Sequence, residues 1–382
     1  MHDDFFYPND NAKVWSGNFI LLTFSGLFTF AMVYGLLTAN TMYLTAGKGY
    51  TFGQAALYMS TFAIGPFLIG SFNGFLIDRY KRKSVCQFPL LLLIVTTYLM
   101  LYVTTPADIM ILRLIQGVLF SLVIMAGGNT LAIDVTPSHK RTYANVSYVW
   151  SNRFGTLLGL ALSAFLYGTI QYEYFIYILC GLGLLALILT LPVKVKFHAP
   201  LGPPVFSLDR FILLSTLRLA VNLLLVGMIL GFLIGHNFDY IFFLLIAIGF
   251  ILAIICNRLK LNDISLMTGL EIGYTVLLFG LVLSALSIGI ASYYVGSVIV
   301  GVGMGITLSR YLLLFIDKAQ HCERGTACNT YMITMGLGIL FGFLCENMWS
   351  STASNFDYII SLVLCILAII VFEVNKYLRP TL

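Results

Sequence analysis

The sequence predicts an all-α polytopic membrane protein, with twelve transmembrane helices arranged in two pseudo-symmetric six-helix bundles. Three observations predict this fold: the chain is strongly apolar, its apolar runs are long enough to cross a bilayer, and its second half repeats spaced residues of its first half. Hydrophobic residues make up 59% of the 382 residues, and charged residues only 10%. A soluble protein would carry about a quarter charged residues, so this composition excludes the soluble classes.

Twelve apolar runs reach the length of about 20 residues that a transmembrane helix needs. They lack the alternation of apolar and polar residues that barrel strands show, and they are too long for such strands. Little more than His236 and Asn237 separates the seventh run from the eighth. The predicted spans cover residues 18–44, 52–76, 84–104, 107–134, 143–169, 173–192, 211–235, 238–256, 264–286, 289–316, 326–348 and 356–376.

The basic residues predict the orientation of these spans. Only Lys48 falls in a loop on one side of the membrane, and four arginines fall inside spans. Cytoplasmic loops are enriched in Lys and Arg, so both termini are expected in the cytoplasm, and the net charge of +5 reflects this asymmetry rather than a nucleic-acid partner. The sixteen basic residues on the cytoplasmic side are Lys13, Arg79, Lys81, Arg82, Lys83, Lys140, Arg141, Lys194, Lys196, Arg210, Arg258, Lys260, Lys318, Arg324, Lys376 and Arg379.

The seven cysteines are scattered through the chain, with no CxxC motif and no His/Cys cluster. Most lie within or beside apolar runs, where cysteine behaves as a small core residue. The sequence therefore predicts no disulfide, no metal site and no cofactor.

Spaced residues of the first half recur in the second half. Two parallel halves of this kind are a standard construction of transporters. We predict a first bundle at 1–192, a cytoplasmic linker at 193–210 and a second bundle at 211–382. The matching pairs, each separated by 183 residues, are Asp134 and Asp317, Arg141 and Arg324, Gly155 and Gly338, and Gly159 and Gly342.

Three motifs carry a resemblance to the major facilitator superfamily. The segment from Gly74 to Lys83 resembles the family's signature loop G-x-x-x-D-R-x-G-R-K, with Lys81 in place of the second glycine. The R-x-x-Q-G pattern of helix four is matched by residues 113–117. Gly155 and Gly159 stand where antiporter members carry a glycine-rich element, with Leu160 in place of the usual proline.

The resemblance implies two bundles that rock about a central site, and a loop between helices two and three that holds the cytoplasmic side shut. Asp78 is expected to meet the start of helix eleven near Thr326, where the helix dipole favours an anion. Arg79 or Arg82 is expected to pair with Asp134. The alternative is that Asp78 is a solvated acid that balances the loop's cations. The predicted latch residues are Gly74, Asp78, Arg79, Arg82, Lys83, Asp134 and Arg141.

The four repeated glycines have two interpretations. Glycines four residues apart let membrane helices approach closely, and packing alone would account for Gly155, Gly159, Gly338 and Gly342. The resemblance gives the first pair a part in antiport.

Charges inside predicted spans are expensive and therefore point to function. Arg153 lies about 15 Å into helix five, close to the midplane, and is a candidate substrate contact. Glu271 and Arg310 lie at similar depth and are expected either to neutralise each other or to act in coupling, whereas Glu346 either reaches water or couples transport to protons. The candidate substrate and coupling residues are Tyr34, Arg113, Gln116, Arg153, Glu271, Arg310 and Glu346.

These observations favour a secondary active transporter that exports a small organic solute in a proton-coupled cycle. Helix one holds no acid while arginines accompany the cavity helices, so the substrate is expected to be anionic or neutral and polar-aromatic. The alternatives are uptake or exchange of an organic anion, a membrane-embedded enzyme, a channel or a scramblase. An enzyme would need clustered His, Asp or Cys, and the five histidines are far apart in sequence. We expect a monomer in a bacterial inner membrane, with lipid, solute and protons as its partners.

Overall fold

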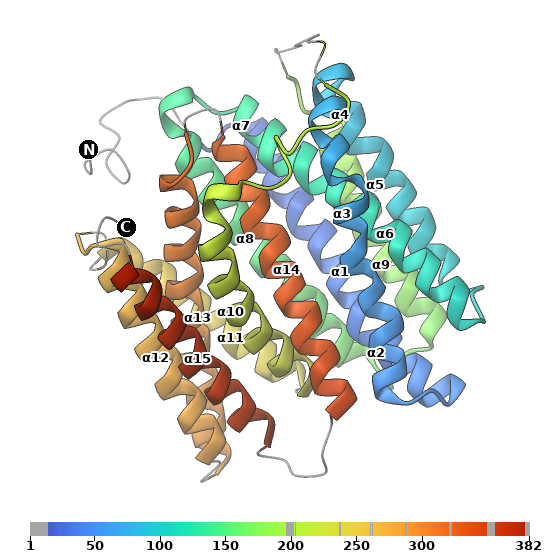
Figure 1. Cartoon of the computed structure of the whole chain (residues 1–382). Helices are drawn as coiled ribbons and strands as arrows, with labels where there is room; N and C mark the ends of the chain where they lie inside the picture. Colours follow the sequence, from blue (N-terminus) through green and yellow to red (C-terminus); the bar gives the residue numbers. More distant parts are fainter. Residues whose placement is uncertain are drawn as a thin grey trace. The chain divides into compact units, whose positions relative to one another are not determined.

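The computed structural model describes the backbone of residues 14–195, 202, 204–236, 238–259, 261, 263–286, 289–320, 323–349 and 356–378 (Figure 1). Within these residues the secondary structure is helical throughout and contains no β-strand. The helices are α1 (Gly17–Lys48), α2 (Phe52–Ser60), α3 (Gly65–Ile69), α4 (Asn73–Arg79), α5 (Arg82–Leu99), α6 (Pro106–Ala126), α7 (Ala132–Asp134), α8 (Arg141–Leu166), α9 (Tyr172–Thr190), α10 (Leu217–His236), α11 (Tyr240–Leu259), α12 (Leu266–Leu286), α13 (Ile290–Asp317), α14 (Arg324–Trp349) and α15 (Phe356–Leu378).

Each predicted span corresponds to a helix or a stack of short helices, which confirms the predicted all-α membrane fold. Among the described residues, ten helical segments are long and apolar enough to cross a membrane by themselves. The other two predicted spans correspond to α5 and α8. Helix α5 has only 18 residues and starts with Arg82 and Lys83. Helix α8 carries Asn145, Asn152 and Arg153, so its length spans a membrane although its composition is more polar.

Local sequence signals fix the ends of several helices. The Ser16 side chain accepts a hydrogen bond from the Phe19 N–H at the start of α1. Gly49 ends the same helix with φ 71°, the left-handed conformation that glycine adopts without strain. At the start of α6, the Thr105 hydroxyl accepts from the Asp108 N–H, and Pro106 occupies the first turn, where its missing N–H costs nothing.

Two predicted spans are interrupted rather than continuous. The span at 52–76 is divided into α2, α3 and α4 by 3₁₀ turns at Thr61–Ile64 and Gly70–Phe72. Pro66 lies in the first turn of α3. Proline has no backbone N–H, and in the first turn of a helix that N–H would have no intrahelical partner. Between α6 and α7, residues Gly127–Leu131 form a π-helical turn, a feature often found at functional sites. The Asp134 carboxylate follows directly after this turn.

By their internal contacts, the described residues form two compact units. Of the described residues, the first unit holds those within 14–50, 57–213 and 319–330, and the second holds those within 51–56, 214–318 and 331–378. The first turns of α14 therefore belong to the first unit. These units are defined by contacts and not by the repeat, so the bundle boundaries at 1–192 and 211–382 stay a prediction. Of the predicted linker, residues 196–201 and 203 lie outside the described part.

In the first unit, α1 packs against α8 and α9. A Cβ added to Gly155 would overlap the carbonyl of Leu27, and one added to Gly159 would overlap the carbonyl of Ala31. The glycines therefore permit backbone contact between α1 and α8.

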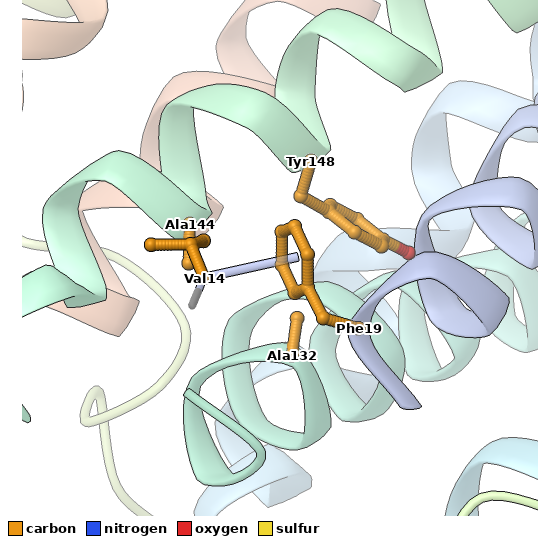
Figure 2. Close-up of a cluster of buried hydrophobic side chains, with 5 residues drawn as sticks. All are labelled: Val14, Phe19, Ala132, Ala144 and Tyr148. Carbon is orange, nitrogen blue, oxygen red and sulfur yellow. The ribbon is translucent and has the colours of Figure 1, made fainter. Parts of the chain in front are cut away.

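A cluster of buried apolar side chains lies where the start of α1 meets α7 and α8. Figure 2 shows Phe19 of α1 between Ala132 of α7 and Tyr148 of α8, with Val14 and Ala144 beside them. All five residues are at most 9% exposed, so the segment before α1 is anchored at the end where α7 and α8 meet.

The second unit repeats the glycine contact between α10 and α14. A Cβ at Gly338 would overlap the carbonyl of Leu224, and one at Gly342 would overlap the carbonyl of Met228. The helices α12 and α13 form the other main contact of this unit. The close packing predicted for the repeated glycines is thus present in both units, and their part in antiport stays a prediction.

Candidate functional site

Arg82 at the start of α5 is held between two carboxylates. Its Nη1 donates to both oxygens of Asp134, at 2.8 and 2.7 Å, and its Nη2 lies 3.5 Å from Asp78 Oδ1. The three side chains are only 11–12% exposed. The predicted pairing of the loop with Asp134 is therefore present, and it is made by Arg82 rather than Arg79.

Arg210, at the end of the segment before α10, is fixed through its side chain and its backbone. Its Nη2 donates to Asp78 Oδ1 at 2.9 Å. Its N–H donates to Thr326 Oγ1 at 2.9 Å, and its carbonyl accepts from Asn329 Nδ2 at 3.2 Å. The residue has φ 58°, a conformation that costs a non-glycine residue about 1 kcal/mol and persists only where surrounding contacts impose it.

The start of α14 is bound by Asp209 and not by Asp78, which corrects the predicted contact. The Thr326 hydroxyl donates to Asp209 Oδ1 at 3.1 Å. The Asp78 carboxylate is bonded instead to the Arg210 side chain, whose Nη2 donates to Asp78 Oδ1. The physical reason is that Arg82 and Arg210 already contact the Asp78 carboxylate. A second acid, Asp209, therefore accepts the hydrogen bond at the start of α14.

We call Asp78, Arg82, Asp134, Asp209, Arg210 and Thr326 the latch cluster. Sequence analysis missed Asp209 and Arg210, which it counted only as part of the linker. A signal was present, because Asp209-Arg210 repeats the dipeptide Asp78-Arg79. The positive φ of Arg210 and its partners follow from tertiary contacts that no spacing in the sequence reveals.

The other predicted latch residues do not all belong to this cluster. Lys83 donates to the carbonyl of Leu191 at 2.6 Å and so caps the end of α9. Arg79 is exposed and makes no hydrogen bond or ion pair within the described part of the chain. Gly74 is buried beside the linker, since a Cβ there would lie 3.6 Å from the carbonyl oxygen of Asp209.

A polar cavity of about 330 Å³ adjoins the latch cluster. Among its lining residues are Arg141 and Asn145 from α8 and Arg324 from α14. Arg141, the remaining predicted latch residue, therefore faces the same cavity as its repeat partner Arg324. The full lining is Arg82, Met125, Asn129, Thr130, Ile133, Asp134, Arg141, Asn145, Asp209, Arg210, Arg324, Gly325 and Thr326.

Arg113 is held entirely within the first unit. Its Nε donates to the carbonyl of Met59 at 3.2 Å, and its Nη1 donates to Gln116 Oε1 at 2.8 Å. Its guanidinium lies 4.7 Å from the centre of the Phe62 ring, and the residue is 1% exposed. Arg113 and Gln116 therefore join α6 to α2 instead of projecting a free charge into a cavity, contrary to expectation.

Arg153 has a different environment. It lies near the middle of α8, half-buried, with its guanidinium 4.6 Å from the centre of the Trp150 ring on the same helix. A cation over an aromatic face is favourable. Tyr34 of α1 is buried and stacks on Phe30, with ring centres 6.0 Å apart.

The predicted pair between Glu271 and Arg310 is absent. The Glu271 carboxylate is bonded to Lys376 of α15, with an Nζ to Oε1 distance of 2.5 Å, and its side chain is 39% exposed. Arg310 donates instead to the carbonyl of Leu261. Each charge therefore has a partner other than the predicted one, although the buried Arg310 Nε has none among the described residues, and the convergence of guanidinium groups on one hollow stays a prediction.

Among the acidic side chains that the structure describes in the second unit, Glu346 in α14 is the buried one. It is 5% exposed, so the expectation that it reaches water is wrong. Its carboxylate lies against α10, because a Cβ at Gly235 would overlap it. Small residues on α10 thus make room for the acid beside the helix backbone.

Comparison with known proteins decides the family. The model of the Major Facilitator Superfamily matches residues 22–343. The chain belongs to the major facilitator superfamily. It is therefore a multi-pass membrane transporter and not an enzyme.

Two kinds of relative agree with this assignment. The chain is 25% identical over 182 residues to the quinolone resistance protein NorA of Staphylococcus aureus, covering 47% of this chain and 45% of that relative. The chain thus spans about half the length of the curated relatives that it matches. Among solved structures, the nucleoside transporter NupG has a TM-score of 0.69 at 14% identity, covering 94% of this chain and 99% of that one. The human organic anion transporter MFSD10 has a TM-score of 0.66 at 14% identity, covering 93% and 99%.

Proposed function

We propose that this transporter exports a small organic solute from the cytoplasm by alternating access, with protons as the coupling ion. The similarity to a quinolone resistance protein supports export of an aromatic drug-like solute. The distribution of basic residues supports a bacterial inner-membrane protein with both termini and the latch cluster on the cytoplasmic side.

The latch cluster is the observation that carries the alternating-access proposal. It joins the start of α14 and the segment before α10 to α4, α5 and α7 through side-chain contacts. Such contacts can separate without breaking the hydrogen bonds of any helix. Charge-assisted hydrogen bonds contribute about 1.5–3 kcal/mol each, which is enough to favour one closed state without making it permanent.

Arg153 supports an anionic or polar-aromatic substrate. Arg113 and Arg310 give that preference little support, because Arg113 donates to Met59 and Gln116 and Arg310 donates to the carbonyl of Leu261. Arg153 with Trp150 presents a cation and an aromatic face together, and both can contact an aromatic carboxylate.

Glu346 is the proposed coupling acid. Glu271, the other acid considered, is ion-paired with Lys376 and more than a third exposed, whereas Glu346 is buried. Acids inside membrane helices often belong to proton relays, and a change of access between the two sides can load and unload the proton of such an acid.

Transport into inside-out proteoliposomes tests the proposal. We expect a fluorescent fluoroquinolone to accumulate when the lumen is acidic, and the accumulation to collapse when a protonophore is added. Accumulation that ignores the proton gradient but follows a gradient of a second organic anion would contradict coupling to protons and would favour the alternative, anion exchange.

A further inference from the structure

The latch cavity contains more positive charge than its carboxylates neutralise. Four of its lining residues are arginines and two are aspartates, and Asp78 beside the cavity contacts two of these arginines, Arg82 and Arg210. Asp134 is engaged by Arg82, and Asp209 accepts from Thr326 and from the Arg210 N–H. Within the described residues, Arg141 and Arg324 have no carboxylate within ion-pair distance. Both arginines are half-buried, and charges withdrawn from water are normally paired, so a counter-charge is missing at this place.

Several hydrogen-bond donors around the cavity are also unused. Among the described residues, the Nε–H groups of Arg141, Arg210 and Arg324 are buried and find no partner. Asn145 is 1% exposed, and neither its amide nitrogen nor its amide oxygen has a partner. Since both amide atoms are unpaired, this result does not depend on which way the amide is turned. Native proteins leave few such groups unsatisfied, and each calls for a ligand or an ordered solvent molecule.

The backbone adds to this positive potential. Helix α8 begins at Arg141 and α14 begins at Arg324, and both helices have 26 residues. The free N–H groups and the dipole at the start of a long helix attract anions. Two helix starts therefore lie around one cavity, together with two guanidinium groups that have no carboxylate partner among the described residues, although Arg324 Nη1 donates to Thr142 Oγ1 at 3.4 Å.

We propose that the latch cavity binds a small oxyanion of the phosphate class between Arg141 and Arg324. Guanidinium groups match the oxygens of such an anion, and the cavity of about 330 Å³ is large enough to admit one. By bridging the start of α8 to the start of α14, the anion would strengthen the closed latch. This effect on transport rests on the proposed function of the latch cluster, whereas the binding itself does not.

Thermal unfolding of the purified full-length protein tests the site. In detergent, potassium phosphate should raise the melting temperature in a saturable way by about 2 °C or more over potassium chloride of equal ionic strength. Arg141→Gln and Arg324→Gln should weaken the apparent affinity by about tenfold, because each removes one charged donor. Arg218→Gln, at an exposed arginine outside the cavity, is the matched control and should respond like the unmodified protein.

Asn145→Asp keeps the test decisive if the arginine variants unfold. This substitution places a carboxylate four residues after Arg141, so it should raise the melting temperature without phosphate and abolish the response to phosphate. A merely structural asparagine would give a lower melting temperature and an unchanged phosphate response, and that result would overturn the proposal.

Lipid nanodiscs distinguish the two sources of a phosphate group. Stabilisation by inorganic phosphate in detergent would identify a free anion. The alternative outcome is a melting temperature that rises only in phosphatidylglycerol nanodiscs, compared with phosphatidylcholine nanodiscs. If Arg324→Gln abolishes that rise, the ligand is a lipid headgroup. No specific stabilisation in either medium, or an equal response in all variants, would mean that the cavity holds water only and would overturn the proposal while leaving the latch cluster intact.

Discussion

At the scale of single residues, the latch cluster depends on hydroxyl and carboxylate groups that each serve two partners. Thr326 accepts from the Arg210 N–H and donates to Asp209, and it is only 3% exposed. Its hydroxyl therefore holds a residue in the left-handed conformation and a carboxylate at the same time.

Thr326→Val should destabilise the protein by about 0.5–1.5 kcal/mol, because it removes the hydroxyl that bonds both the Arg210 N–H and Asp209 and leaves these two groups only their bond to each other. The measurement is the melting temperature of the purified variant. Thr326→Ser keeps the hydroxyl and should lose much less stability. Equal losses in the two variants would show that the methyl group matters and the hydrogen bonds do not.

Arg153→Ala should weaken binding of an anionic aromatic ligand about tenfold or more, since a charged donor over an aromatic face is removed. Binding is measured by quenching of tryptophan fluorescence or by calorimetry. Arg113→Lys, which alters a charge already engaged by Met59 and Gln116, serves as the comparison and should change stability more than affinity. Unaltered ligand binding in Arg153→Ala would assign that arginine to structure alone.

The sequence predicted side-chain contacts within the motifs. It did not predict the contacts made by the segment before α10. The pair between Arg82 and Asp134 follows from the signature loop and the repeat. The contacts of Arg210 depend on a linker that no helical period describes. Arg310 was misjudged because depth in a span indicates which charges lie at one level but not which face of the helix carries them.

At the scale of elements, the apolar runs predicted the helices well, since length and hydropathy alone decide whether a segment crosses a bilayer. The interruptions of the second span by 3₁₀ turns and the π-helical turn before Asp134 were not predicted. Pro66 is a local sign of the first interruption, but the π turn has no comparable signal beyond Gly127 and Gly128.

The glycine contacts lead to a prediction about helix packing. Gly159→Ala and Gly342→Ala should each destabilise the protein by about 1–3 kcal/mol, because a methyl group would force α1 from α8 and α10 from α14. Gly181→Ala on α9 is the matched control, since nothing lies within 4 Å of its added Cβ. That variant should be neutral or slightly more stable, as alanine favours helix. A melting temperature that falls equally in all three variants would contradict the packing interpretation.

At the scale of the whole molecule, family membership makes the chain a transporter, and the latch cluster gives it a candidate gate. Asp78 accepts from Arg210 and lies against Arg82, so its charge holds two cations that belong to different segments. Opening the gate requires these contacts to break and closing it requires them to re-form.

Asp78→Asn should slow transport in proteoliposomes by about tenfold while ligand affinity stays within a few-fold, because the gate loses charge but the substrate site does not. Arg79→Gln, at the adjacent exposed arginine, should leave the transport rate near that of the unmodified protein. Unchanged turnover in Asp78→Asn would remove this carboxylate from the gate.

The most direct measurement locks the gate with a disulfide between Ile133→Cys on α7 and Gly325→Cys on α14. An added Cβ at Gly325 would lie 3.9 Å from Ile133 Cδ1, so the two positions face each other, and mass spectrometry verifies the bridge in a background whose native cysteines are replaced. If the latch must open in every cycle, oxidation should stop solute transport and a reductant should restore it. Transport by either single-cysteine variant should not change on oxidation. Full transport through the oxidised, bridged protein would contradict the account.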